Sequence, residues 1–115
     1  MKSMTTGNAI KSLAALSQES RLGIYRLLVQ QGPAGLTVGV IAERMDMAGA
    51  TLSFHLKELA HAELVLARQE GRFIRYSANY AAMGRLMDYL TENCCQGQAC
   101  AVECKPKEPQ QRKRA

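Results

Sequence analysis

Tryptophan is absent from this chain of 115 residues, and aromatic residues make up only 5% of it. Proteins that bind single-stranded nucleic acids stack the bases on aromatic side chains, so this scarcity argues weakly against that class. No segment approaches the roughly 18–20 consecutive apolar residues of a membrane-spanning helix, and the N-terminus lacks the apolar core of a signal peptide. We therefore expect a cytoplasmic protein with no membrane partner and with reduced thiols.

Cysteine is absent from the first 93 residues, and all four thiols lie close together near the end of the chain, at Cys94, Cys95, Cys100 and Cys104. Basic charge is concentrated just beyond them. Residues 105–115 carry five basic side chains and one acidic side chain, a net charge of +4, so the rest of the chain contributes only +1 of the total of +5. The basic balance is therefore weak evidence for nucleic-acid binding, which must rest on recognition elements.

A composition of 47% hydrophobic and 22% charged residues is typical of a globular protein, and the length favours one domain. We place this domain at residues 8–93. A flexible N-terminus is expected at residues 1–7, a cysteine segment at 94–104 and a basic flexible tail at 105–115.

The first half of the domain favours three helices. Asn8 is the expected N-cap of the first, and Ser17, or alternatively Ser20, is the expected N-cap of the second. Gly32-Pro33 ends the second helix. Thr37 then caps a short helix with the sequence "VGVIAERM".

A fourth helix, "AGATLSFHLKELAHA", follows a turn at Asp46-Met47. On a helical wheel its leucines share one side, at Leu52, Leu56 and Leu59. The opposite side carries Ala50, Phe54, Lys57 and His61, flanked by Thr51 and Ser53. A short helix, a tight turn and a second helix with a polar N-terminal half are typical of a helix-turn-helix.

The periodicity then changes to that of strands on both sides of Glu70-Gly71, with Gly71 supplying a turn at positive φ. This predicts a β-hairpin with Arg68, Arg72 and Arg75 on or near its tip. A last helix, "YAAMGRLMDYLTEN", carries the apolar stripe Met83, Leu86, Met87 and Leu90. We therefore predict a mainly α fold with a β-hairpin wing (α+β), a winged helix-turn-helix of about five helices and two short strands.

Such a unit reads DNA by placing its second helix in the major groove and its hairpin on the backbone or in the minor groove. The second helix and the hairpin offer short polar side chains for base edges, basic side chains for phosphates and one apolar side chain for a thymine methyl. The predicted DNA interface is Thr51, Ser53, Phe54, His55, Lys57, Arg72 and Arg75. Plainer interpretations stay open: a solvated helical corner, surface arginines, and a partly buried structural role for His55, which lies nearer the leucine side.

Three motifs, "ALSQESRLGIYRLL", "TLSFHLKELAHAELV" and "QEGRFIRYSAN", resemble in order and spacing the ArsR (SmtB/ArsR) family of metalloid-responsive repressors. The resemblance covers about residues 9–93. It implies a homodimer formed by the first and last helices, which binds a palindromic operator in double-stranded DNA and releases it when a metal or metalloid binds. The chain departs from the family at Gly49-Ala50 and Phe54, where relatives often carry polar residues.

The dimer is also favoured by the residues themselves. The apolar stripe of the last helix and the first helix need to be covered, and a small monomer has few elements left to cover them. The alternative is that the stripe packs internally.

The family's better-known arsenic site, a cysteine pair in the first helix of the helix-turn-helix, is missing from "VGVIAERM". The last helix offers only Asp88 and Glu92, which argues against a first-row metal site built from imidazole and carboxylate. Soft As(III) or Sb(III) favours three thiolates. We therefore expect one of these metalloids as inducer, and no organic cofactor, with Cys94 and Cys95 as ligands and either Cys100 or Cys104 as the third. Some relatives sense arsenic through cysteines after the last helix, so the resemblance supports this C-terminal type of site.

Other chemistries of the same four thiols stay open: a tetrahedral zinc site, a disulfide switch such as Cys95 with Cys104, or incidental thiols. An enzyme is not expected, because a reactive thiol usually lies at a helix N-terminus and these cysteines follow a helix C-terminus. The sequence thus predicts a transcriptional repressor of metalloid resistance genes, with a winged-helix regulator carrying zinc or a redox switch as the alternative.

Overall fold

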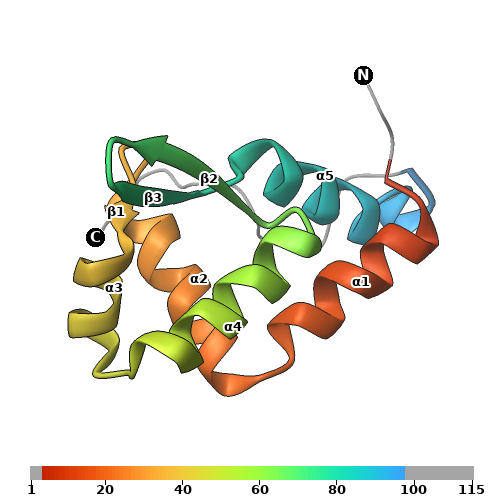
Figure 1. Ribbon diagram of the computed structural model, residues 1–115. Coiled ribbons are helices and arrows are strands. Elements are labelled where there is room, and N and C mark those ends of the chain that lie inside the picture. Colours follow the sequence, from red (N-terminus) through yellow and green to blue (C-terminus); the bar gives the residue numbers. More distant parts are fainter. Residues whose placement is uncertain (1–3, 98–115) are drawn as a thin grey trace, which may run out of the picture.

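The computed structural model describes residues 4–97 (Figure 1). Cys100, Cys104 and the basic tail lie outside the described residues. The elements follow in the order α1 (Thr6–Leu16), α2 (Glu19–Gln31), β1 (Leu36–Thr37), α3 (Val38–Met45), α4 (Gly49–His61), β2 (Val65–Glu70), β3 (Phe73–Ala78) and α5 (Tyr80–Leu90), and a short 3₁₀ turn (Cys94–Gly97) comes last. The predicted winged helix-turn-helix, with five helices and a hairpin, is confirmed.

Strand β1 was not predicted. It makes the sheet three-stranded, in the antiparallel order β1-β3-β2, by pairing Leu36 with Tyr76 and Thr37 with Arg75. The loop before it passes tightly against β3, since a Cβ placed on Gly35 would lie 2.2 Å from the carbonyl oxygen of Tyr76. Two residues give no readable periodicity, so only the distant pairing with β3 defines this strand.

Two of the predicted helix starts are wrong. Thr5 caps α1, and its side chain accepts a hydrogen bond from the backbone N–H of Asn8, which lies inside the helix. Gln18 caps α2, while Ser17 belongs to the end of α1. In both cases the side-chain oxygen reaches an N–H three residues ahead, as capping requires.

The predicted end of α2 at Gly32 is confirmed, with φ of 99°. Thr37 precedes α3 as predicted, although its side chain makes no capping hydrogen bond. The last helix is shorter than predicted and ends at Leu90 instead of Asn93. Thr91 is the C-cap residue, and its backbone N–H and its hydroxyl both donate to the Met87 carbonyl, the hydroxyl at 2.9 Å.

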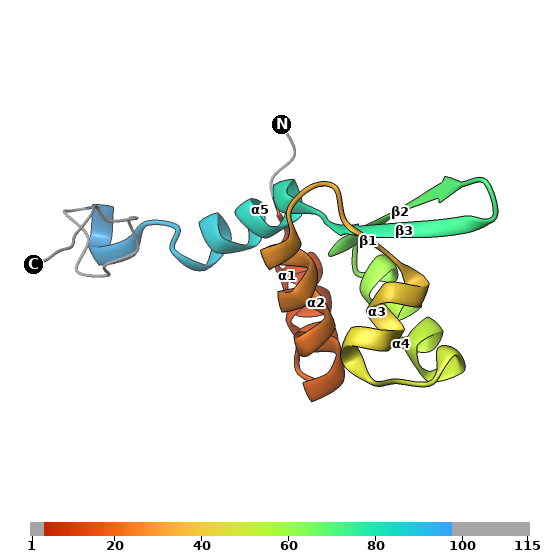
Figure 2. The same cartoon turned by 90° about the vertical axis from the view of Figure 1, so that its left-hand side faces the viewer.

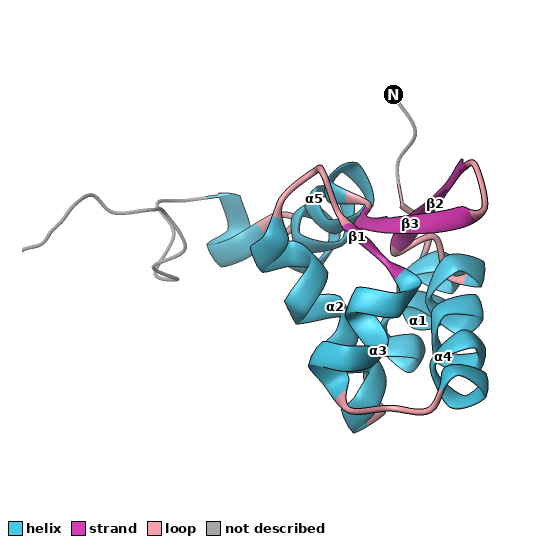
Figure 3. Cartoon of the chain, turned by 60° about the vertical axis from the view of Figure 1, so that its left-hand side comes forward, coloured by secondary structure: helices cyan, strands magenta, loops and turns pink. Residues whose placement is uncertain are grey.

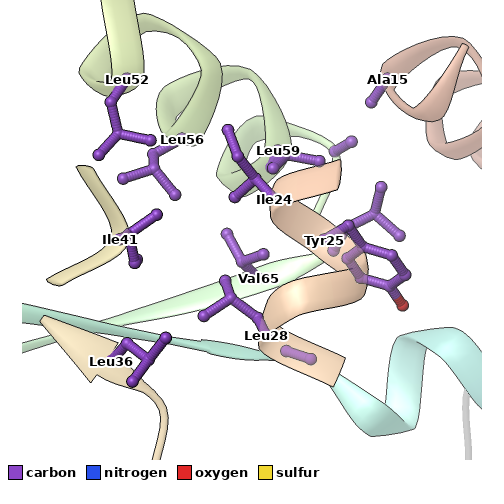
Figure 4. Packing of buried hydrophobic residues seen from close by; sticks show 13 residues of the cluster. Ala15, Ile24, Tyr25, Leu28, Leu36, Ile41, Leu52, Leu56, Leu59 and Val65 are labelled. Carbon is purple, nitrogen blue, oxygen red and sulfur yellow. The ribbon is translucent and has the colours of Figure 1, made fainter. Parts of the chain in front are cut away.

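The core lies between α2, the helix-turn-helix and the sheet. Figure 4 shows Ile24 and Leu28 of α2 between the leucines of α4 and the strands. Seven large side chains are almost completely buried, namely Ile24, Leu28, Ile41, Leu52, Leu56, Leu59 and Leu64. The predicted leucine side of α4 is therefore its buried side, and it fixes which side of the helix faces outward.

Two parts of the molecule project in opposite directions (Figure 2). The β2–β3 hairpin, residues 65–78, is called the wing here, and it extends from the same side as the N-terminal part of α4. Helix α5 and the 3₁₀ turn extend from the other side, and the view in Figure 3 agrees. Within residues 4–97, no helix combines the length and apolar character that a membrane span needs.

Candidate nucleic-acid interface and cysteine segment

The outward side of α4 carries the predicted groove-reading residues. Thr51, Ser53, Phe54 and Lys57 are all exposed, with Phe54 exposed at 56%. The helix starts after Ala48, which has no side-chain acceptor for the first N–H groups. Such N–H groups at a helix start suit a DNA phosphate. The structure thus brings together a polar helix start, an apolar ring and a cation on one open surface.

His55 is different, because its side chain is buried at 8% exposure. Its Nδ1 lies 3.3 Å from Nη1 of Arg21 on α2, and Arg21 also donates from Nε to the Ala15 carbonyl at 2.8 Å. Of the two roles left open by the sequence, burial therefore favours the structural one.

The wing places Arg72 at its tip. Gly71 has φ of 63° and Arg72 does not have positive φ, as in a two-residue turn with glycine in the first position. Arg72 is exposed, and within residues 4–97 it has no hydrogen bond or ion pair. Its guanidinium is therefore available for phosphate.

Arg75 lies further from the tip than the sequence suggested, opposite Arg68 and Thr37. Its Nε pairs with Oε1 of Glu70 at 3.0 Å, and its Nη1 donates to the carbonyl of Gly35 at 3.2 Å. Arg75 thus links the wing to the loop before β1, in addition to its predicted role at the backbone of DNA.

Glu70 forms ion pairs with two arginines, since its Oε2 also pairs with Nη2 of Arg68 at 2.8 Å. Hydrogen bonds from Arg75 and then Arg68 lower the pKa of the Glu70 carboxyl below its ordinary value. The carboxylate offsets part of the positive charge of the wing, and Glu70 was not among the residues predicted for the interface. The pairing of Glu70 with the arginines could have been predicted, because the hairpin register places residues 68, 70 and 75 on one side of the wing.

The described part of the cysteine segment holds two thiols side by side. The Sγ atoms of Cys94 and Cys95 lie 3.5 Å apart, well beyond the ~2.05 Å of a disulfide bond. These cysteines follow the C-terminus of α5 as predicted, and a turn at residues 91–93 separates them from the helix. Positive φ at Asn93, Cys95 and Gln96 makes this a sharply curved segment. Within residues 4–97 no set of three metal-ligating side chains occurs, and the two other cysteines lie outside that range.

Helices α1 and α5 lie side by side and leave large apolar side chains uncovered (Figure 1). Four of these are more than two-fifths exposed, namely Ile10, Leu13, Met87 and Leu90. We call these four the α1/α5 apolar face. The predicted stripe of α5 is therefore divided, because Leu86 is buried while Met87 and Leu90 point outward.

Comparisons with known proteins agree with this geometry. A family model described as a helix-turn-helix domain matches residues 16–67. The HTH-type transcriptional regulator YbzH of Bacillus subtilis (strain 168) is 30% identical, over 70% of this chain and 93% of the relative. An ArsR-like transcriptional regulator from Rhodococcus sp. RHA1 superposes with a TM-score of 0.65 at 30% identity, over 73% of this chain and 76% of that one.

The same fold occurs in a homodimeric winged helix-turn-helix DNA-binding domain from Mycobacterium bovis, with a TM-score of 0.60 at 23% identity. That match covers 89% of this chain and all of the other. The relatives are transcriptional regulators, and the helix-turn-helix and wing are those of a DNA-binding domain. The chain belongs to the ArsR family of winged helix-turn-helix transcriptional regulators.

Proposed function

We propose that this regulator binds a palindromic operator as a homodimer, represses metalloid resistance genes and leaves the DNA when As(III) or Sb(III) binds its C-terminal cysteines. The observation that carries the proposal is the pair of neighbouring thiols, Cys94 and Cys95, with Sγ atoms 3.5 Å apart beyond the end of α5. Two thiolates so close can bind one soft ion together.

The third thiolate would come from Cys100 or Cys104. Both follow the pair within ten residues, so closing a loop back to it costs little entropy. Helix α3 contains no cysteine, so the other arrangement known for the family is not available to this chain. A soft three-coordinate metalloid therefore fits the available ligands better than a first-row metal does.

The homodimer is supported by the α1/α5 apolar face. Covering these exposed apolar side chains with a second copy is favourable by about 25 cal/mol per Å² of apolar surface removed from water. A two-fold axis through this face repeats the helix-turn-helix on the second subunit, and two such units read half-sites about one DNA turn apart. The M. bovis domain of the same fold is itself a homodimer.

The cysteine pair follows Leu90, the last residue of this face, closely in sequence. The Thr6 hydroxyl, at the start of α1, and the Tyr89 hydroxyl, near the end of α5, share a hydrogen bond. Metalloid binding that pulls on the end of α5 would therefore also move α1. The inducer can cause release of DNA only if it binds the DNA-free form of the protein more tightly than the DNA-bound form. By linkage, DNA must weaken inducer binding by the same factor as the inducer weakens DNA binding.

The test is release of a labelled operator duplex during titration with As(III), Sb(III), Zn(II) or Cd(II). Native protein should respond to As(III) and Sb(III), and Cys94→Ser and Cys95→Ser should abolish the response while leaving operator affinity unchanged. Cys100→Ser and Cys104→Ser then identify the third ligand. Release by zinc alone would favour the zinc alternative, and release only by oxidants would favour the redox alternative.

A further inference from the structure

A large apolar side chain next to the tip of the wing is not packed against the rest of the described chain. Phe73 is 62% exposed and is the first residue of β3, directly after the tip residues Gly71 and Arg72. The buried end of the hairpin is at the opposite end, where Val65 pairs with Ala78 and each is only 3% exposed. Leaving an aromatic ring in water forgoes the free energy of its burial, so packing within the described chain does not account for it.

The surroundings of Phe73 are cationic. Arg72 is its neighbour at the tip, and Glu70, its partner across the hairpin, holds Arg68 and Arg75 just behind it. An apolar ring framed by arginines matches the DNA minor groove, which has a strongly negative potential and sugar walls with apolar surface. If Phe73 contacted a second copy of this chain, we would expect apolar residues around it, as in the α1/α5 apolar face. That face lies elsewhere on the molecule.

The position of the ring also fits DNA. Each strand of the wing has six residues, so the tip lies roughly 17 Å from the buried end of the hairpin at about 3.4 Å per residue. The wing and the N-terminal part of α4 extend on the same side of the molecule (Figures 2 and 3). A duplex whose major groove receives α4 would therefore present a neighbouring minor groove to the tip.

We propose that Phe73 is a DNA-contacting residue, which places its ring in the minor groove flanking the sequence read by α4, while Arg72 contacts the adjacent phosphates. This deepens the proposed operator binding and rests on it. The contact is apolar, so it adds affinity without neutralising a phosphate. Its contribution should consequently be insensitive to salt, unlike that of Arg72.

The first experiment measures binding of the full chain to a duplex that the native protein has selected from a random-sequence pool, at several salt concentrations. Phe73→Ala should weaken binding about tenfold with the same slope of log K against log salt, and Phe73→Leu should lose less. Arg72→Ala should instead reduce that slope by about 1. The control is Leu66→Ala, which removes another exposed apolar side chain of the wing, 53% exposed and nearer the body, and which should bind like the native protein.

The second experiment uses the absence of tryptophan from the chain. Phe73→Trp introduces a single indole, and its emission should change in intensity and wavelength when the selected duplex is added, whereas Leu66→Trp should show no such change. Equal affinity of Phe73→Ala and native protein would overturn the contact, as would an unchanged Phe73→Trp emission at saturating DNA. Weaker dimerisation of Phe73→Ala would assign the ring to a subunit contact. If native protein selects no duplex, the proposed operator binding itself fails.

Discussion

Nη1 of Arg21 lies 3.3 Å from Nδ1 of His55, and this contact ties α2 to α4, the second helix of the helix-turn-helix. Because a guanidinium can only donate, Nδ1 accepts, and the His55 proton is on Nε2. The same guanidinium donates from Nε to the Ala15 carbonyl near the end of α1, at 2.8 Å. Three helices therefore meet at the Arg21 side chain.

Arg21→Gln should disturb DNA reading as well as stability. We expect the free energy of unfolding to fall by about 1.5–3 kcal/mol, the range for a lost hydrogen bond to a charged group. Operator affinity should fall about tenfold, since a reading helix held loosely loses its fixed geometry. Arg21→Lys should lose part of both the stability and the affinity, because an ammonium group cannot reproduce the planar set of donors of a guanidinium. Denaturant unfolding and operator titration measure the two quantities.

The matched control is Arg26→Gln, which removes an exposed arginine from the same helix. It should change the stability by less than about 0.5 kcal/mol. If Arg21→Gln were as mild as Arg26→Gln, the contact with His55 would have no role in holding α4.

The hydrogen bond between Thr6 and Tyr89 should matter for induction more than for DNA binding. It joins the cysteine end of α5 to α1, whose other end reaches Arg21. Tyr89→Phe should leave operator affinity without metalloid unchanged. The factor by which As(III) weakens that affinity should decrease about threefold or more. Titrations with and without As(III) measure the factor, and Tyr76→Phe is the control, since within residues 4–97 that hydroxyl has no hydrogen bond. An unchanged factor in Tyr89→Phe would exclude this route.

The fold could be predicted because its main signals are local. The leucine spacing of α4 and the glycine of the wing turn each define an element within a few residues. The Arg21–His55 contact could not be predicted, because its partners are 34 positions apart and the helical wheel left His55 between two sides. Strand β1 depends likewise on its pairing with the distant strand β3. The pair Cys94–Cys95 was visible as adjacent letters in the sequence, whereas Cys100 and Cys104 lie outside the described residues.

Glu70→Gln should strengthen DNA binding. The substitution frees Arg68 and Arg75 from their carboxylate and raises the net charge of the wing by one, so affinity should rise severalfold at low salt with a steeper salt dependence. The control is Glu58→Gln on α4, which removes an exposed acid outside the wing. A rise of the same size in Glu58→Gln would mean that net charge alone is responsible.

The same pairing predicts a pH dependence of stability. The arginines hold the pKa of Glu70 below its ordinary value of 4.5, so the pairing stabilises the folded protein above that pH. This stabilisation is lost as the pH falls through the lowered pKa. Native protein should therefore exceed Glu70→Gln in stability at neutral pH, and the difference should vanish in acid, as thermal unfolding across pH would show.

Gly35→Ala should destabilise the protein strongly. Its φ is 70°, and an added Cβ would lie 2.2 Å from the Tyr76 carbonyl oxygen, which is backbone and cannot move aside. We expect a loss of about 2–4 kcal/mol and a displaced β1. The control is Gly39→Ala in α3, where nothing lies within 4 Å of the new Cβ, and which should stabilise by about 0.5–1 kcal/mol. Equal effects of the two changes in denaturant unfolding would contradict the close approach of this loop to β3.

Two tyrosines between α2 and α5 should respond in opposite ways to loss of their hydroxyls. The Tyr25 hydroxyl is buried and has no hydrogen-bond partner in the described part of the chain, whereas the Tyr80 hydroxyl donates to the Val29 carbonyl at 2.8 Å. Tyr25→Phe should therefore stabilise the protein by about 1 kcal/mol, because a buried polar group without a partner costs free energy. Tyr80→Phe should destabilise it by about 0.5–1.5 kcal/mol.

Alkaline pH separates these two variants further. Burial, and then the neighbouring Tyr80, raise the pKa of Tyr25 above its ordinary value of 10.0. Above that pH the unfolded chain loses the Tyr25 proton first, so the native protein loses stability as the pH rises toward the raised pKa. Tyr25→Phe lacks this loss, and its advantage over native protein in urea unfolding should grow above pH 10. A constant or shrinking advantage would show that the Tyr25 hydroxyl reaches water in the folded protein.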